Sequence, residues 1–166
     1  MLSLKPDLYV DSIQDISIDH LVKLKIKGLI IDVDNTITEW NSPELKQEVY
    51  DWFSQLKARN IRACIASNNS QARVIGIAKS LGIPAISKAG KPRRRSFLQA
   101  MQAINTLPEA TAVIGDQLFT DILGGKRLGL YTILVKPINS KEFVGTRLMR
   151  QLEKIVLKKC NLVKRN

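Results

Sequence analysis

The chain has 166 residues, of which 45% are hydrophobic, so it is not a disordered tail and is long enough for one domain with a real core. Its net charge of +11 favours an anionic partner, such as nucleic acid, acidic lipid or a phosphorylated substrate. The two cysteines, Cys64 and Cys160, lie in an apolar and a basic segment, which predicts a reducing compartment and no disulfide framework.

The N-terminal segment, residues 1–27, is expected to be irregular, with a short helix near 18–24. Pro6, Asp7 and Asp11 interrupt any signal-peptide pattern there. No apolar stretch of the chain approaches the roughly 18–20 residues that a membrane helix needs. We therefore expect a cytoplasmic protein that contacts a membrane at most peripherally.

Apolar strand-like segments alternate with amphipathic helix-like segments from residue 28 onward. Strands are predicted at 28–34, 61–67, 84–87, 111–115 and 130–135. Helices are predicted at 43–59, 70–81, 93–106, 117–128 and 141–161. This alternation is typical of an α/β protein with a parallel sheet of about five strands flanked by helices. We expect a single domain, 1–166, that ends in a basic C-terminal helix within 141–166.

The predicted helix boundaries depend on a few cap residues. Ser42 is the expected N-cap of the helix over 43–59, with Pro43 in its first turn. The helix over 70–81 should stop at Gly82, and Ser70 is placed to cap its start.

Three of the predicted strands end in polar residues. Asp32 and Asp34 end the first, Ser67 and Asn68 end the second, and Asp116 follows the fourth. In an open parallel sheet, ligands bind at the carboxyl ends of the strands, so these side chains should converge. Alternate side chains of an extended chain point the same way, so Asp32 and Asp34 are predicted to face one pocket. Grouped carboxylates favour Mg²⁺, which prefers oxygen ligands.

Further charged residues follow at positions that suit phosphate chemistry. Lys88 and Lys91 both precede the helix over 93–106, whose N-terminus favours anions. Asp121 comes five residues after Asp116 and could hold a water molecule or orient Lys91. Such a set suits phosphoryl transfer, which depends on positioning and electrostatic stabilisation.

The ordered set DxDxT, a strand-end Ser, Lys-Pro and GDxxxxD spans residues 32–121 and resembles the haloacid dehalogenase (HAD) phosphohydrolase superfamily. The resemblance implies a Rossmann-like fold and Mg²⁺ as cofactor. It implies that Asp32 is the nucleophile and a metal ligand, that Asp34 is the general acid/base with a backbone carbonyl contact to the metal, and that Thr36 steadies the loop. It further implies that Ser67 and Lys91 bind phosphate, that Asp116 is a metal ligand, and that Asp121 supports the site or binds the metal through water. Asn68, next to Ser67, is a further candidate donor to phosphate. The family spacing favours Lys91 over Lys88, whereas Ser67 and Asn68 keep the alternative of capping the next helix.

A narrower likeness is carried by "IDVDNT", "AGKPRRRSF", "GDQLFTDILGGKRLGLYTILVKPI" and "KEFVGTRLMRQLE", which together resemble subfamily IIIA in its phosphatidylglycerophosphatase branch. It implies dephosphorylation of phosphatidylglycerophosphate to phosphatidylglycerol. The short spacings between the motifs leave no room for a large cap domain, so the pocket is expected to be open to a lipid headgroup. The basic C-terminal helix could then dock on anionic lipid.

Other readings remain open. The same chemistry could act on a soluble phosphomonoester or a phosphoprotein. A basic RNA- or ribosome-binding protein with a vestigial site is the alternative of another class. The acidic set and the lack of a recognised RNA-binding motif argue against it, so no nucleic acid partner is expected. A calcium loop is disfavoured because Thr36, Ile37 and Pro43 stand where an EF-hand needs Asp or Asn, Gly and Glu.

Overall fold

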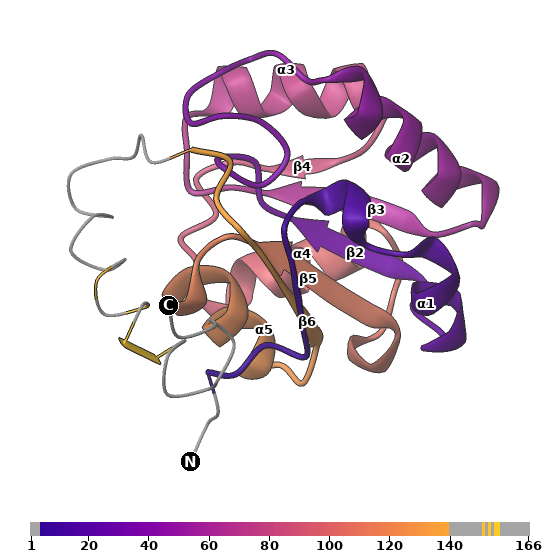
Figure 1. Ribbon diagram of the computed structural model, residues 1–166, viewed down its shortest axis with the longest axis vertical. Coiled ribbons are helices and arrows are strands. Elements are labelled where there is room, and N and C mark those ends of the chain that lie inside the picture. Colours follow the sequence, from indigo (N-terminus) through magenta and orange to yellow (C-terminus); the bar gives the residue numbers. More distant parts are fainter. Residues whose placement is uncertain (1–3, 140–150, 152, 154, 157–166) are drawn as a thin grey trace.

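A parallel six-stranded sheet forms the centre of the protein (Figure 1). The computed structural model describes residues 4–139, 151, 153, 155 and 156. The strands are β1 (Leu8–Val10), β2 (Gly28–Ile31), β3 (Arg62–Ala66), β4 (Ala85–Ile86), β5 (Thr111–Gly115) and β6 (Tyr131–Val135). Their order across the sheet is β1-β6-β5-β2-β3-β4, and all neighbouring strands are parallel. The predicted α/β class is confirmed, with one strand more than expected.

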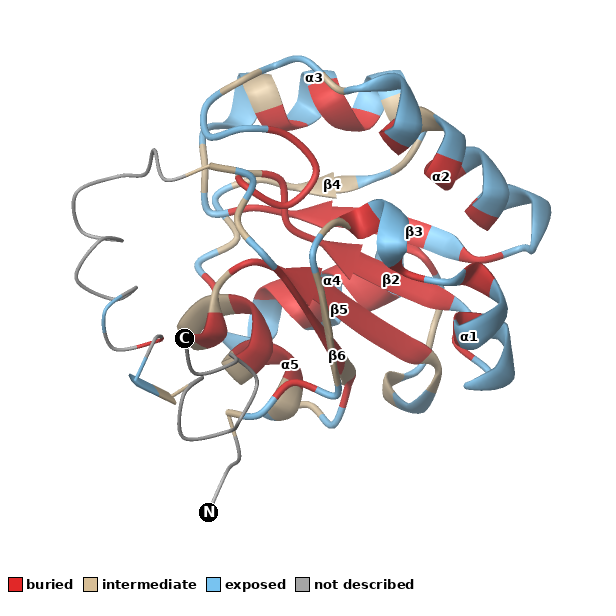
Figure 2. Ribbon diagram, in the orientation of Figure 1, coloured by how far each residue is buried: buried red, intermediate tan, exposed pale blue. Residues whose placement is uncertain are grey.

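Both faces of the sheet are buried beneath helices (Figure 2). Leu29 and Ile31 of β2 belong to one core, which α1 (Ile18–Lys23), α2 (Gln47–Ala58) and α3 (Gln71–Leu81) cover. Ile30, between them, belongs to a second core with α4 (Arg94–Ala103). Successive side chains of a strand point to opposite faces, so a strand covered on both sides needs a continuous apolar run. The sequence 28–31 has this pattern.

The segment 117–128 departs from the single helix predicted there. A turn of π-helix, η3 (Leu118–Ile122), leads into the short helix α5 (Leu123–Lys126). The two glycines of α5 allow close packing. A Cβ on Gly124 would lie 2.3 Å from the Phe97 ring, and a Cβ on Gly125 would lie 2.3 Å from Val113 Cγ1. Because these two glycines have no side chain, the helix can pack closely against α4 and the sheet.

The N-terminal segment is more regular than predicted. The short helix expected near 18–24 is α1, but β1 and the 3₁₀ helix η1 (Ile13–Asp15) were expected to be irregular. β1 pairs with β6 at the edge of the sheet, and its three residues are half-buried. Such a short edge strand has too few residues to show an alternating pattern.

Helix α2 begins four residues later than the predicted cap implies. Its N-cap is Lys46, so the prediction of Ser42 as cap and Pro43 in the first turn is wrong. Thr38 Oγ1 donates to the Glu44 carbonyl at 2.5 Å, and Arg73 Nη1 donates to the Ser42 carbonyl at 2.8 Å. These contacts hold the segment as a loop. Helix α3 behaves as predicted, with Ser70 at the N-cap and Gly82 left-handed after its end.

The predicted C-terminal helix lies largely outside the described residues. Gln151, Glu153, Ile155 and Val156 are helical. Glu153 is buried, and its Oε1 accepts a hydrogen bond from the Leu118 backbone N–H at 2.7 Å. In the part of the chain that the structure describes, helices are too short or too polar to cross a bilayer.

The strand order fixes where a ligand can bind. From β2 the chain proceeds to β3 and β4 on one side, and later to β5 and β6 on the other. The connections leaving β2 and β5 therefore diverge, which opens a crevice beyond the carboxyl ends of these two strands. The loops that line the crevice come directly after β2 and β5, and no separate cap domain is inserted between the described elements.

Candidate active site

Asp32 lies directly beyond the carboxyl end of β2. Its backbone N–H donates to the Ile114 carbonyl at 2.9 Å, which extends the pairing with β5 by one residue. The backbone of Asp32 is therefore fixed by the sheet, and the residue is 7% exposed at the floor of the crevice.

The loop after Asp32 is a tight turn and does not continue the strand to residue 34 as predicted. The N–H groups of Thr36, Ile37 and Thr38 all donate to the Val33 carbonyl, at 3.1–3.3 Å. Asn35 adopts a left-handed conformation with φ of 59°. Asp32 and Asp34 both line one pocket.

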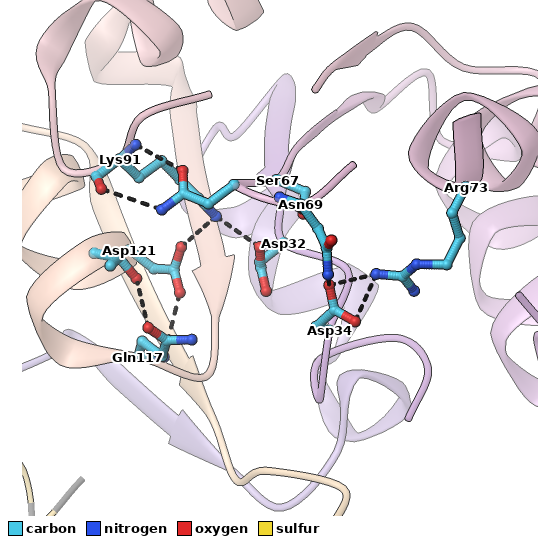
Figure 3. Close-up of polar contacts among 10 residues, drawn as sticks. Asp32, Asp34, Ser67, Asn69, Arg73, Lys91, Gln117 and Asp121 are labelled. Carbon is cyan, nitrogen blue, oxygen red and sulfur yellow. Dashed lines mark hydrogen bonds and ion pairs between the residues drawn. The ribbon is translucent and has the colours of Figure 1, made fainter. Parts of the chain in front are cut away.

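Lys91 is inserted into the acidic cluster (Figure 3). Its Nζ donates to Asp32 Oδ1 at 2.7 Å and to Asp121 Oδ1 at 2.6 Å. All three side chains are at least nine-tenths buried. Buried charges of this kind are stable only when they are paired and hydrogen-bonded, so the lysine and the two carboxylates depend on one another.

Asn68 holds the backbone of Lys91 in place. Its Oδ1 accepts from the Lys91 N–H at 2.8 Å, and its Nδ2 donates to the Lys91 carbonyl at 3.2 Å. Ser67, also buried, accepts from the Asn69 N–H at 3.2 Å. The amide of Asn68 thus positions the lysine, whereas its predicted contact with phosphate stays a prediction.

A third carboxylate completes the cluster. Asp116 follows β5, and Asp121 lies on the π-helical turn η3. One oxygen each from Asp32, Asp116 and Asp121 lie within 4.8 Å of one another. Gly115 makes this arrangement possible, because a Cβ at that position would lie 2.2 Å from Asp121 Cγ.

The donor set suits a divalent cation. The three carboxylates of the cluster and the ammonium group of Lys91 together carry a net charge of −2, which Mg²⁺ would neutralise. Asp32, Asp116 and Asp121 would hold the ion. Among the described residues the side-chain group holds Asp121 and not Asp34, and Asp121 also contacts Lys91, which is one of the roles considered for it from the sequence. The predicted backbone contact of Asp34 with the metal stays a prediction.

The electrostatics of the cluster shift two pKa values. Burial raises the pKa of Asp32 from 3.8 to about 6, and the negative charges of Asp121 and Asp34 oppose the lowering effect of Lys91. Burial alone would lower the pKa of Lys91, but Asp121 and Asp32 outweigh it and raise that pKa above its ordinary value. The lysine is therefore a permanent cation, whereas Asp32 takes up a proton in mildly acidic solution when no metal is bound.

The pocket above these groups has a volume of about 310 Å³. Its wall residues are Asp32, Asp34, Asn35, Trp40, Ser67, Asn68, Asn69, Lys91, Gln117 and Thr120. Trp40 is 38% exposed and contributes an aromatic wall. Thr36, within the turn after Asp32, is buried, and its Oγ1 has no hydrogen-bond partner among the described residues.

Arg73 was absent from the predicted site. It lies in the first turn of α3, and its Nη2 donates to Asp34 Oδ1 at 2.6 Å and to Oδ2 at 2.5 Å (Figure 3). A sequence signal for it exists. A cation in the first turn of a helix opposes the helix dipole, so its presence there indicates a nearby anion.

A family model for haloacid dehalogenase-like hydrolases matches residues 39–129. The chain is 41% identical to the probable phosphatase YqeG of Bacillus subtilis, over 92% of this chain and 88% of that protein. It is 26% identical to the mitochondrial phosphatidylglycerophosphatase GEP4 of Saccharomyces cerevisiae, over 80% of this chain and 77% of that protein. Among solved structures, a HAD subfamily III A hydrolase from Legionella pneumophila superposes with a TM-score of 0.52 at 21% identity, covering 85% of this chain and 87% of that one.

These findings agree with the acidic cluster at the carboxyl ends of β2 and β5. The chain belongs to the haloacid dehalogenase-like hydrolases, which confirms the predicted superfamily. It is a phosphatase of that superfamily.

Proposed function

We propose that the protein is a Mg²⁺-dependent phosphomonoester hydrolase that acts through an aspartyl-phosphate at Asp32, with phosphatidylglycerophosphate as its substrate. The observation that carries the chemistry is the buried cluster in which Lys91 bridges Asp32 and Asp121. Asp32 has a fixed backbone and faces the pocket, as a nucleophile must.

Two steps follow from this assignment. In the first, an oxygen of Asp32 forms a bond to phosphorus while the bond to the leaving oxygen breaks, and Asp34 supplies the proton that this oxygen needs. In the second, Asp34 accepts a proton from water as the water oxygen bonds to phosphorus and the bond between phosphorus and the Asp32 oxygen breaks, which releases phosphate and regenerates Asp32. Lys91 and Ser67 hold the phosphoryl group, and Asn68 fixes the lysine. Mg²⁺, when bound, would neutralise charge on the transferring group.

The choice of a lipid substrate is supported by the relatives. Besides the yeast protein, chloroplastic phosphatidylglycerophosphate phosphatase 1 of Chlamydomonas reinhardtii is 25% identical over 89% of this chain and 59% of that protein. An exposed tryptophan at the pocket and a net charge of +11 suit a substrate whose phosphate projects from an anionic surface. We therefore also propose peripheral contact with anionic membranes.

The test is phosphate release with and without Mg²⁺ from phosphatidylglycerophosphate in mixed micelles and from a panel of soluble monoesters. We expect Mg²⁺-dependent turnover that is fastest on the lipid, and loss of turnover in Asp32→Asn without loss of the fold. Fast turnover of soluble monoesters with none on the lipid would overturn the lipid assignment. Full activity of Asp32→Asn would overturn the mechanism.

A separate measurement tests the membrane contact. Vesicles that contain phosphatidylglycerol should sediment more of the protein than neutral phosphatidylcholine vesicles, and added salt should reduce the difference. Equal recovery with both vesicles would remove the electrostatic part of the proposal.

A further inference from the structure

The carboxylate of Asp34 is held on the side of the pocket that faces α3. In Figure 3 it points toward Arg73, whereas Asp32 points toward Lys91. Asp34 is 13% exposed in its side chain and Arg73 is 10% exposed, so the pair is largely removed from water. An arginine–carboxylate pair in such surroundings is a strong and directional contact.

Hydrogen bonds reach both oxygens of Asp34. Oδ1 accepts from the Asn41 backbone N–H at 2.8 Å and from Arg73 at 2.6 Å. Oδ2 accepts from Asn69 Nδ2 at 3.0 Å and from Arg73 at 2.5 Å. These four contacts, two on each oxygen, orient the carboxylate.

The donors of Asp34 are themselves fixed. Arg73 Nη1 donates to the Ser42 carbonyl at 2.8 Å, which ties the loop after β2 to α3. Asn69 Oδ1 accepts from the Ser70 N–H at 2.7 Å, so its amide orientation is set by the start of α3. Arg73 and Asn69 therefore form a rigid frame around Asp34.

We propose that Arg73 is a positioning residue that sets the direction of the Asp34 carboxylate and thereby its reach toward the leaving oxygen and the attacking water. This inference rests on the proposed function, in which Asp34 exchanges protons with both. A displacement of about 1 Å in a catalytic group can lower a rate by roughly 100-fold, so loss of this frame should be visible in kcat.

The test compares the variants Arg73→Met and Arg73→Lys with Asp34→Asn and the double variant Arg73→Met/Asp34→Asn. Each is assayed on an alkyl phosphate and on p-nitrophenyl phosphate, whose weakly basic leaving group needs little proton donation. We expect Arg73→Met to lower kcat on the alkyl phosphate by roughly 10- to 100-fold, more than on the aryl phosphate, with KM within about threefold. Arg73→Lys should recover part of the loss.

The double variant separates a role through Asp34 from a structural role. If Arg73 acts through Asp34, adding Arg73→Met to Asp34→Asn should lower kcat by less than about twofold further. Arg59→Met is the matched control, because Arg59 forms an exposed ion pair with Asp19 outside the pocket, at 2.6 Å. Its kcat should equal that of the wild type.

The outcomes distinguish the two proposals. Equal loss from Arg73→Met in both backgrounds, or equal loss on both substrates, would overturn the positioning role while the proposed function stands. If Arg73→Met keeps the wild-type kcat while Asp34→Asn loses activity, the positioning role is likewise overturned and the proposed function stands. No turnover by the wild type on any monoester with Mg²⁺ would overturn the proposed function and this inference with it.

Discussion

Replacing Lys91 with methionine should destabilise the metal-free protein strongly. The substitution removes the only cation that the structure gives both Asp32 and Asp121 as an ion-pair partner among the described residues, while a side chain of similar length stays in place. Breaking a buried pair from one side costs about 3–5 kcal/mol, because the remaining charge stays buried. For a domain of this size each kcal/mol shifts the melting temperature by roughly 2–4 °C, so we expect a decrease of roughly 6–20 °C.

Asp32→Asn is the matched variant, and it should not destabilise the metal-free protein. Burial raises the pKa of Asp32 to about 6, so at neutral pH the charged form is less favourable in the folded state than a neutral one. From a shift of about two units, Asn at this position should leave stability unchanged or raise it by up to about 3 kcal/mol.

The assay is thermal unfolding followed by circular dichroism at pH 7.5, with EDTA and with Mg²⁺. Mg²⁺ should raise the melting temperature of Lys91→Met more than that of the wild type, because the variant has three carboxylates and no ammonium group. Melting of Lys91→Met within 2 °C of the wild type in EDTA would refute the reasoning, as would an equal destabilisation by Asp32→Asn.

Two further substitutions and two effects of pH probe the same cluster and its wall. Asp116→Asn should weaken Mg²⁺ binding by at least about tenfold, measured by titration calorimetry, and an unchanged affinity would remove Asp116 from the metal site. The Mg²⁺-induced rise in melting temperature should shrink as pH falls through about 6, where Asp32 takes up a proton, and a constant rise between pH 7.5 and 5.5 would contradict its role as a ligand. In the metal-free protein the contribution of Asp32 to stability should fall as pH rises from 3.8 to about 6, because the folded state binds this proton more tightly. Trp40→Ala should leave the melting temperature within about 2 °C, since the side chain is 38% exposed, but should raise KM for the lipid, and an unchanged KM would exclude a substrate contact.

Most of the sheet could be predicted because its central strands are buried on both faces. In a parallel α/β protein, continuous apolar runs such as 28–31 and 111–115 have few alternatives to forming a buried strand. The three-residue strand β1 could not be found in this way, because it lies at an edge and is only half-buried. The predicted start of α2 was wrong for another reason. Ser42 and Pro43 form a valid cap signal, but contacts from Thr38 and Arg73 hold the segment as a loop.

The sequence predicted which residues form the candidate site better than it predicted which of them contact one another. Polar residues that follow buried strands must meet at one edge of the sheet, which predicted that Asp32 and Asp116 would lie close together, and Lys91 was expected there from its place before a helix. Which carboxylate joins the cluster depends on the turns after each strand. The contact of Asp121 with Lys91 was one of two roles considered for Asp121, whereas the pairing of Asp34 with Arg73 was not predicted. The types of these turns do not follow from spacing alone.

The π-helical turn makes the length of this segment as important as its composition. Asp121 follows Asp116 by five residues, and the turn from Leu118 to Ile122 is wider than an α-helical one. Deleting Thr120 would allow an ordinary α-helical turn and rotate the following side chains by roughly 100° about the helix axis. Asp121 would then no longer contact Lys91, and the lysine would keep Asp32 as its one carboxylate partner among the described residues. The loss of a single codon in this turn would therefore dismantle the centre while every charged residue of the cluster stayed in the sequence.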